Sequence, residues 1–203
     1  MIRYLAVALV CAILYTTVGI AVSHAPPSGI DLAGRALLGG PSHLALLFTE
    51  SCYWYVLVAF GIAGIIVAVR VPAWRARIIT WLVTMVVSWQ VSDALKNVFR
   101  RPRPDYWRLI HEPSFAYSSG HAMFATIVYG LWAWYVWHSD LPRTVRLVVA
   151  PLLVLWACGI LWSRLSLGAH YVTDLVGGVL LGLTALSAGA AVRAALAQRA
   201  TAR

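Results

Sequence analysis

Charged side chains are scarce in this chain of 203 residues: only 11% are charged, and just seven are acidic. Hydrophobic residues make up 61%, whereas an average soluble domain has about half, so the composition argues against an ordinary soluble domain. With so few charges, the net charge of +9 does not indicate a nucleic-acid-binding protein. In a membrane protein, a positive net charge is explained by basic cytoplasmic loops, by contacts with anionic lipid headgroups or by binding of an anionic substrate.

Groups that bind metals or form disulfides are also few. The three cysteines, Cys11, Cys52 and Cys158, each lie within an apolar run and have neither metal-ligand nor disulfide-framework spacing, so we expect small buried hydrophobic side chains. No cluster of carboxylates could hold a divalent metal. His111-Glu112 lacks the second histidine of a zinc-protease helix. The sequence therefore predicts neither a metal nor another cofactor.

Long apolar runs are abundant. A membrane-crossing helix needs about 20 apolar residues, and six segments qualify or nearly do: 4–23, 53–69, 78–95, 121–137, 147–162 and 171–192. We predict an all-α fold, a single membrane domain over residues 1–203 with a bundle of six transmembrane helices. The first segment could instead be a cleaved signal peptide. Residues 30–48 form either an interfacial segment or an ordered loop.

The distribution of arginine predicts the orientation. The links 70–77 and 139–146 and the C-terminal tail carry arginines and fall on one side of a six-span bundle, so the positive-inside rule places both termini in the cytoplasm. Segment 96–120 falls on the other side and breaks that rule with five cations: Lys96, Arg100, Arg101, Arg103 and Arg108. An anionic ligand at this extracytoplasmic face would explain them.

A first group of chemically active residues lies between the last two predicted spans. Arg164 offers a fork of donors suited to phosphate or carboxylate. His170 and Asp174 are four residues apart, so on a helix they can touch. A carboxylate that accepts from one imidazole nitrogen leaves the other nitrogen basic. Charged groups at a span end are costly unless they have a function, so we interpret residues 163–174 as part of a functional site.

Two further groups reach the same predicted face, within segment 96–121. The first contains Lys96 and Arg103, with prolines at 102 and 104 that end the helix. The second is Ser118-Ser119-Gly120-His121, where small residues at a helix start let backbone N–H groups approach an anion. Cations, hydroxyls and helix-end amides suit a phosphoryl group. A paired histidine could act as nucleophile and an unpaired one as general acid.

The three groups together resemble the signature of the type-2 phosphatidic acid phosphatase superfamily, which also contains vanadate-dependent haloperoxidases and glucose-6-phosphatase. The resemblance spans Lys96 to Asp174 in order and spacing. The chain departs from the usual pattern at Ser118, where the family has proline; this removes no catalytic group.

The resemblance implies roles for the residues that match. His170 would attack phosphorus and form a phosphohistidine, Asp174 would orient it, and His121 would protonate the leaving oxygen. The phosphate oxygens would be bound by Lys96, Arg103, Ser119, Gly120 and Arg164. Arg100 and Arg101 lie outside these matches and could bind substrate or lipid headgroups, or face solvent.

We therefore expect a metal-independent phosphatase of a membrane lipid phosphate or diphosphate, in the inner or plasma membrane, with its site on the extracytoplasmic face. An isoprenyl diphosphate such as undecaprenyl diphosphate is favoured, because an outward site suits recycling of a carrier lipid. The alternatives are a phosphatidylglycerophosphate, phosphatidic acid or lipid A phosphatase, a lipid phosphotransferase with the same pocket, or a lipid transporter without hydrolysis. The sequence leaves the oligomeric state open.

Overall fold

The computed structural model describes residues 1–40, 42–105, 110 and 112–201, and within these ranges the chain is helical and has no strand. This confirms the all-α prediction. The elements are α1 (Ile2–Ser23), α2 (Gly29–Leu38), α3 (His43–Glu50), α4 (Trp54–Arg70), the 3₁₀ turn η1 (Pro72–Trp74), α5 (Arg75–Phe99), α6 (Gly120–Ala125), the π-helical segment η2 (Thr126–Gly130), α7 (Leu131–Trp137), α8 (Arg143–Ser166) and α9 (Val172–Thr201).

Within the described ranges, four helical stretches are long and apolar enough to cross a membrane: Ile2–Ser23, Pro72–Phe99, Arg143–Ser166 and Val172–Arg199. A fifth is added if α3 and α4, bent by 40° relative to each other, form one broken span. The segment predicted as the fourth span is divided into α6, η2 and α7. The chain is thus a multi-pass membrane protein, and the number of six spans stays a prediction.

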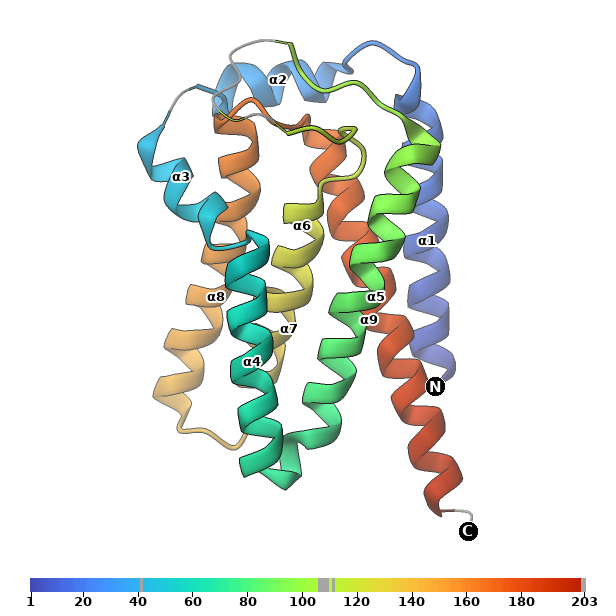
Figure 1. Cartoon of the computed structure of the whole chain (residues 1–203), viewed down its shortest axis with the longest axis vertical. Coiled ribbons are helices and arrows are strands. Elements are labelled where there is room, and N and C mark those ends of the chain that lie inside the picture. Colours follow the sequence, from blue (N-terminus) through green and yellow to red (C-terminus); the bar gives the residue numbers. More distant parts are fainter. Residues whose placement is uncertain (41, 106–109, 111, 202–203) are drawn as a thin grey trace.

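The long helices run side by side, while α2 lies across one end of the bundle (Figure 1). α9 packs against α1, α5 and α6, and α8 packs against α3 and α7. Both chain termini lie toward the end opposite α2 (Figure 1). Arg101, which follows α5, and Thr173, at the start of α9, both bind Asp31 of α2, so segments that carry the motifs gather at one end.

Local sequence signals determine where the helices begin and end at this end of the bundle. α2 begins with a capping box in which Asp31 Oδ2 accepts from the backbone N–H of Ser28 at 3.1 Å. α5 ends because Arg100 is in the left-handed region, with φ of 49°, and Pro102 follows. α6 begins at the Ser119 cap, whose Oγ accepts from the N–H of Ala122 at 3.4 Å.

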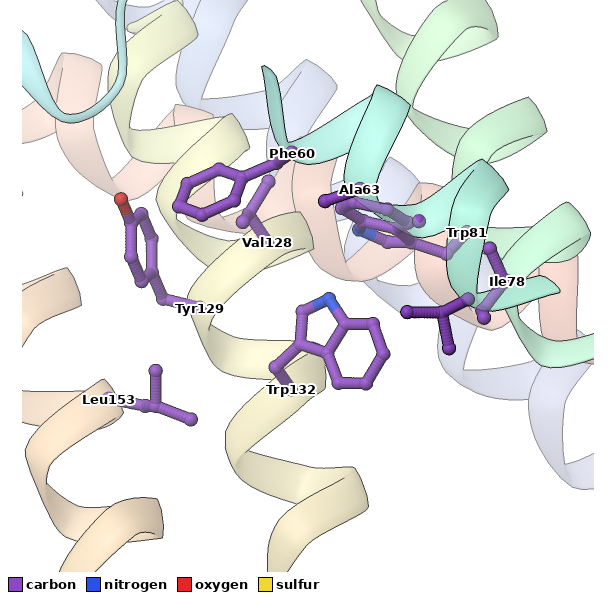
Figure 2. A pocket seen from close by; sticks show the side chains of 10 residues that line it. Phe60, Ala63, Ile78, Trp81, Val128, Tyr129, Trp132 and Leu153 are labelled. Carbon is purple, nitrogen blue, oxygen red and sulfur yellow. The ribbon is translucent and has the colours of Figure 1, made fainter. Parts of the chain in front are cut away.

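An apolar cavity of about 260 Å³ lies deeper in the bundle, among α4, α5, the η2–α7 stretch and α8 (Figure 2). Its wall includes Phe60, Ala63, Trp81, Trp132 and Leu153. Large apolar side chains such as Ile62 and Val86 remain exposed on the outer surface, as expected for helices that contact lipid.

The cysteine prediction holds for two of the three residues. Cys11 and Cys52 are buried. Cys158 is exposed on α8, because an apolar run that faces lipid cannot be distinguished by composition from one that faces the core.

Glycines on α9 allow α6 to approach closely. A Cβ at Gly178 would lie 2.4 Å from the carbonyl oxygen of Ser119 and 2.7 Å from Cβ of Ala122. A Cβ at Gly182 would lie 2.8 Å from Cβ of Thr126. Small residues at helix interfaces are a common way for membrane helices to pack. Here they set the position of the helix start that carries Ser119.

We expect Gly178→Ala to lower both thermal stability and activity, because the new methyl group collides with backbone that cannot move aside cheaply. Overpacking of this kind costs about 1–3 kcal/mol. Thermal unfolding in detergent measures the first effect and phosphate release the second. Gly61→Ala is the matched control, since its Cβ would meet only Leu82 Cδ2 at 3.7 Å. Equal stability of the two variants would contradict the packing role of Gly178.

Candidate active site

The His170 and Asp174 side chains meet where α8 gives way to α9. α8 ends at Ser166, and Gly168 turns the chain with a φ of 66°. Asp174 lies in the first turn of α9, where its Oδ2 accepts from the backbone N–H of Tyr171 at 2.9 Å. His170 Nδ1 lies 3.5 Å from the same oxygen, longer than a good hydrogen bond. Such contacts often tighten when substrate binds.

Arg103 determines which nitrogen of His170 carries the proton. Its Nη1 lies 3.1 Å from His170 Nε2. A guanidinium can only donate, so Nε2 must accept and must have a free lone pair. The proton of the neutral ring is then on Nδ1, the nitrogen that faces Asp174. In this tautomer the lone pair of Nε2 carries no proton.

The surroundings of His170 keep its ring neutral. The residue is 1% exposed. Burial, followed by the positive charges of Arg103, Arg164 and Lys96, holds the pKa of His170 well below its usual value. His121 also acts electrostatically on His170. Four predicted site residues, Lys96, Arg103, His121 and Arg164, therefore lie close enough to His170 to interact with it electrostatically.

Lys96 and Arg103 converge on Ser114. Lys96 Nζ donates to Ser114 Oγ at 2.9 Å. Arg103 Nε donates to the Ser114 carbonyl oxygen at 2.7 Å, and Arg103 Nη2 donates to Ser114 Oγ at 3.1 Å. The sequence had not indicated Ser114, whose only distinguishing feature is that it follows the arginine-rich segment by about ten residues. Its two oxygens hold the two cations side by side.

Arg164 is fully buried and is bound by two residues that the sequence analysis missed. Its Nη1 donates to Thr49 Oγ1 at 2.5 Å, and its Nη2 forms an ion pair with Glu112. The contact to Thr49 connects the end of α3 with the end of α8. Pairs separated by 115 and 52 residues leave no local pattern in the sequence.

The serine, glycine and histidine at the start of α6 lie against α9. The N–H of Ser119 donates to the carbonyl oxygen of Asp174 at 3.1 Å, and Gly120 opens the helix. The His121 ring packs edge-on against Tyr53, with centroids 5.1 Å apart. His121 Nε2 is buried and has no hydrogen-bond partner. A buried unpaired nitrogen costs free energy, which suits a group that exchanges a proton with a ligand.

Arg101 is placed differently from the prediction that it binds substrate or lipid headgroups, or faces solvent. Its side chain is 2% exposed and makes ion pairs with Asp31 and Asp174, so that prediction is wrong for Arg101. Arg100 is exposed. Arg108, the fifth cation of the segment, lies outside the described residues.

Within the described ranges, no group of three or more His, Cys, Asp or Glu side chains could hold a metal ion. The positive charges at the site come from Lys96, Arg103 and Arg164. They could neutralise a bound phosphoryl group in the way a metal does in other phosphoryl-transfer enzymes.

Several known proteins similar to this chain are named as phosphatases. Phosphatidylglycerophosphatase B of Bacillus subtilis (strain 168) is 39% identical over 98 residues, which cover 46% of each chain. Phosphatidylglycerophosphatase B of Escherichia coli (strain K12) is 44% identical over 70 residues, covering 34% of this chain and 26% of the relative. The putative undecaprenyl-diphosphatase YbjG of E. coli (strain K12) is 28% identical over 151 residues, covering 66% of this chain and 71% of the relative.

The matches to the two phosphatidylglycerophosphatases therefore span about half or less of those proteins. A solved structure, the first transmembrane PAP2-type phosphatidylglycerolphosphate phosphatase from B. subtilis, has the same fold, with a TM-score of 0.60 and 24% identity over 90% of this chain and 94% of that chain. The sequence model of the PAP2 superfamily matches residues 52–196, which include all three motif segments. The chain belongs to the PAP2 superfamily.

Proposed function

We propose that this protein is a membrane phosphatase that hydrolyses a lipid phosphate or diphosphate, without a metal, through a phosphohistidine at His170. The observation that carries the proposal is the placement of His170. The ring is buried, its Nε2 lies 3.1 Å from Arg103 Nη1, and its Nδ1 lies 3.5 Å from Asp174 Oδ2.

The reaction has two steps. His170 Nε2 attacks phosphorus while the bond to the lipid oxygen breaks, and His121 donates a proton to that oxygen. Water, activated by His121, then attacks the phosphohistidine and releases inorganic phosphate and the free His170 ring. Lys96, Arg103 and Arg164, together with Ser119 and the Gly120 N–H, stabilise the phosphoryl oxygens in both steps. Asp174 stabilises the positive charge that develops on the imidazole.

We further propose six membrane spans with both termini in the cytoplasm and the site at the extracytoplasmic face. The spans would be α1, the bent α3–α4 pair, α5, the continuous stretch α6–η2–α7, α8 and α9. Arg70, Arg75, Arg143 and Arg146 lie in the helix ends next to the α4–α5 and α7–α8 links, which are away from α2 (Figure 1), and this supports the orientation under the positive-inside rule. α2 would then lie on the outer surface of the bilayer, next to the site.

Two lipid classes compete as the substrate. An isoprenyl diphosphate such as undecaprenyl diphosphate remains our first candidate, because an outward site suits carrier-lipid recycling and one relative is named a putative undecaprenyl-diphosphatase. Phosphatidylglycerophosphate is the second, because the relatives with higher identity are phosphatidylglycerophosphatases. Phosphatidic acid and lipid A phosphates complete the panel that a substrate test needs.

The first prediction concerns the nucleophile. Purified protein should release inorganic phosphate from one or more of these four lipids, and His170→Ala should reduce the rate by at least about 10³-fold, because the proposed covalent intermediate forms on this ring. His138→Ala, at the exposed C-terminal end of α7, is the matched control and should keep the wild-type rate.

Other results would identify the competing functions. Phosphate release by the wild type only when a sugar or lipid acceptor is added would favour a phosphotransferase. Lipid movement across vesicles by wild type and His170→Ala alike, with no phosphate released, would favour a transporter. A variant that keeps substantial hydrolysis without His170 would remove the nucleophile assignment.

Glu112 competes with the substrate for Arg164 in this scheme. Its carboxylate forms an ion pair with Arg164 Nη2, and Arg164 is one of the groups expected to bind phosphate. Glu112 is 20% exposed whereas Arg164 is fully buried, so the carboxylate is the partner that can move away. An incoming phosphate must displace the carboxylate or bind beside a like charge.

We therefore expect Glu112→Gln to lower KM by about two- to tenfold, the range that corresponds to removing about 0.4–1.4 kcal/mol of competition. Initial rates against lipid concentration give the value. Glu50→Gln is the control, since Glu50 is an exposed acid at the end of α3. A higher KM in Glu112→Gln would mean that the carboxylate positions Arg164 instead of competing with the substrate.

The apolar cavity offers space for the substrate's tail. Val128 and Tyr129 line it and lie seven and eight residues after His121 on the same helical stretch, which places the cavity about 10 Å deeper than that histidine. The Tyr129 hydroxyl donates to the Ser51 carbonyl oxygen at 2.9 Å, which joins this wall of the cavity to the link between α3 and α4. A lipid whose phosphate lies at His170 could extend a chain in this direction.

Filling the cavity tests this part of the proposal. Ala63→Phe should raise KM for a long-chain lipid phosphate by about three- to tenfold, since lost burial of about one or two methylene groups costs about 0.8 kcal/mol each. A short-chain analogue with the same headgroup should be unaffected. Ile66→Phe, which adds a ring on the exposed side of α4, is the control. An equal change for both chain lengths would place the tail elsewhere.

A further inference from the structure

We infer that Arg101 is a positioning residue for the phosphohistidine reaction. It holds the Asp174 carboxylate in the orientation that His170 requires, and Asp31 of α2 in turn holds Arg101. The inference rests on the proposed function, because it assigns a role in a reaction that proceeds through His170. Arg101 belongs to none of the predicted phosphate-binding or catalytic positions.

The guanidinium of Arg101 is committed to protein groups. Its Nη1 donates to Asp174 Oδ1 at 2.6 Å and to Thr173 Oγ1 at 2.7 Å, and its Nη2 donates to Asp31 Oδ2 at 2.9 Å. The face of the guanidinium lies 4.4 Å from the ring centroid of Tyr171. With its donors and its face occupied in this way, Arg101 is not arranged as a phosphate ligand, in contrast to Arg103.

The two carboxylate oxygens of Asp174 have different partners. Oδ1 is taken by Arg101. Oδ2 accepts from the Tyr171 N–H at 2.9 Å and faces His170 Nδ1 at 3.5 Å. The plane of the carboxylate is therefore fixed from both sides. Without Arg101, the carboxylate could rotate about its χ2 angle, and the oxygen behind His170 would lose its defined position.

Asp31 fixes the other end of Arg101. Asp31 is 2% exposed, and its Oδ1 accepts from the N–H and the hydroxyl of Thr173 at 2.9 and 2.8 Å. Burial alone would raise the pKa of Asp31, but the hydrogen bonds from Thr173 and Arg101 outweigh it and hold that pKa below its usual value. Asp31 is thus ionised, and it connects α2 to the start of α9.

The backbone of Arg101 reaches a third part of the site. Its carbonyl oxygen accepts from the N–H of Ala116 at 2.9 Å, three residues before Ser119. Arg101 therefore joins the segment after α5, the segment before α6, the start of α9 and the helix α2.

The test compares Arg101→Met with Arg100→Met in the full-length protein in detergent. Arg100 is the neighbouring, exposed arginine. Arg101→Met should lower kcat by about 10- to 100-fold, the effect of a misplaced catalytic group, and should leave KM within about threefold of wild type. Arg101→Lys should recover part of the rate, because one ammonium keeps the charge but cannot serve three acceptors as a planar fork does. Arg100→Met should match wild type.

Orthovanadate separates positioning from a merely structural role. It mimics five-coordinate phosphorus bound at His170, so its inhibition constant should rise in Arg101→Met by about the same factor as kcat falls. A variant that is only less well folded would lose active molecules and thermal stability, while the molecules that remain active would keep the wild-type inhibition constant. That result would overturn the inference.

Asp31→Asn provides a second, milder variant in case Arg101→Met cannot be purified. It should lower kcat by about three- to tenfold with a matching rise in the vanadate inhibition constant, and an unchanged constant would overturn the inference. In the double variant the losses should be less than multiplicative, because both residues act through Asp174. Failure of the proposed function is seen separately: it would appear as full activity of His170→Ala, whatever Arg101 does.

Discussion

The buried carboxylate of Asp174 is the constraint on which the rest of this end of the molecule depends. It is fully buried at the start of a membrane-crossing helix, where an ionised group is costly unless it is paired and hydrogen-bonded. Arg101 pairs with one oxygen, and the Tyr171 N–H binds the other. Both partners are themselves held by neighbours. The stabilisation of one charge thus organises a layer of polar groups across the end of the bundle.

The helix packing next to this polar layer also positions the residues of the site. Gly178 lets the carbonyl oxygen of Ser119 approach α9, and the N–H of Ser119 donates to the carbonyl oxygen of Asp174. The helix that carries His121 is therefore aligned with the helix that carries Asp174 by backbone contacts. Tyr117, just before this helix, has its ring packed against Phe99 and its hydroxyl bonded to the Tyr15 carbonyl oxygen, so α1 and α5 support the same segment.

Much of this arrangement could be predicted from the sequence. The apolar runs indicated helices, because a run of about 20 apolar residues has few other stable forms. The three motif segments indicated a shared site, and the structure places His121, Lys96, Arg103 and Arg164 within electrostatic reach of His170. These inferences depend on residue types and on their spacing within each segment, and both can be read directly from the sequence.

The supporting residues could not be predicted in the same way. Asp31 and Arg101 are 70 residues apart, and Thr49 and Arg164 are 115 apart, so only the fold brings them together. One local signal existed for Asp31, because Ser28 three residues earlier forms the capping box that starts α2. The division of the fourth apolar run into α6, η2 and α7 was also hidden, since a π-helical turn depends on tertiary contacts and not on composition.

The cations of the candidate site are held by different kinds of partner, and the difference bears on function. Arg101 is tied to two carboxylates that are fully buried, so its contacts cannot be exchanged for a ligand without leaving a buried charge unpaired. Lys96 and Arg103 are held by the neutral Ser114, and Arg164 by the partly exposed Glu112. A phosphate can compete with a hydroxyl or a partly exposed carboxylate much more easily. Under the proposed mechanism, the cations that build the site are thus separate from the cations that would bind phosphate, although both kinds occur in the same short arginine-rich segment.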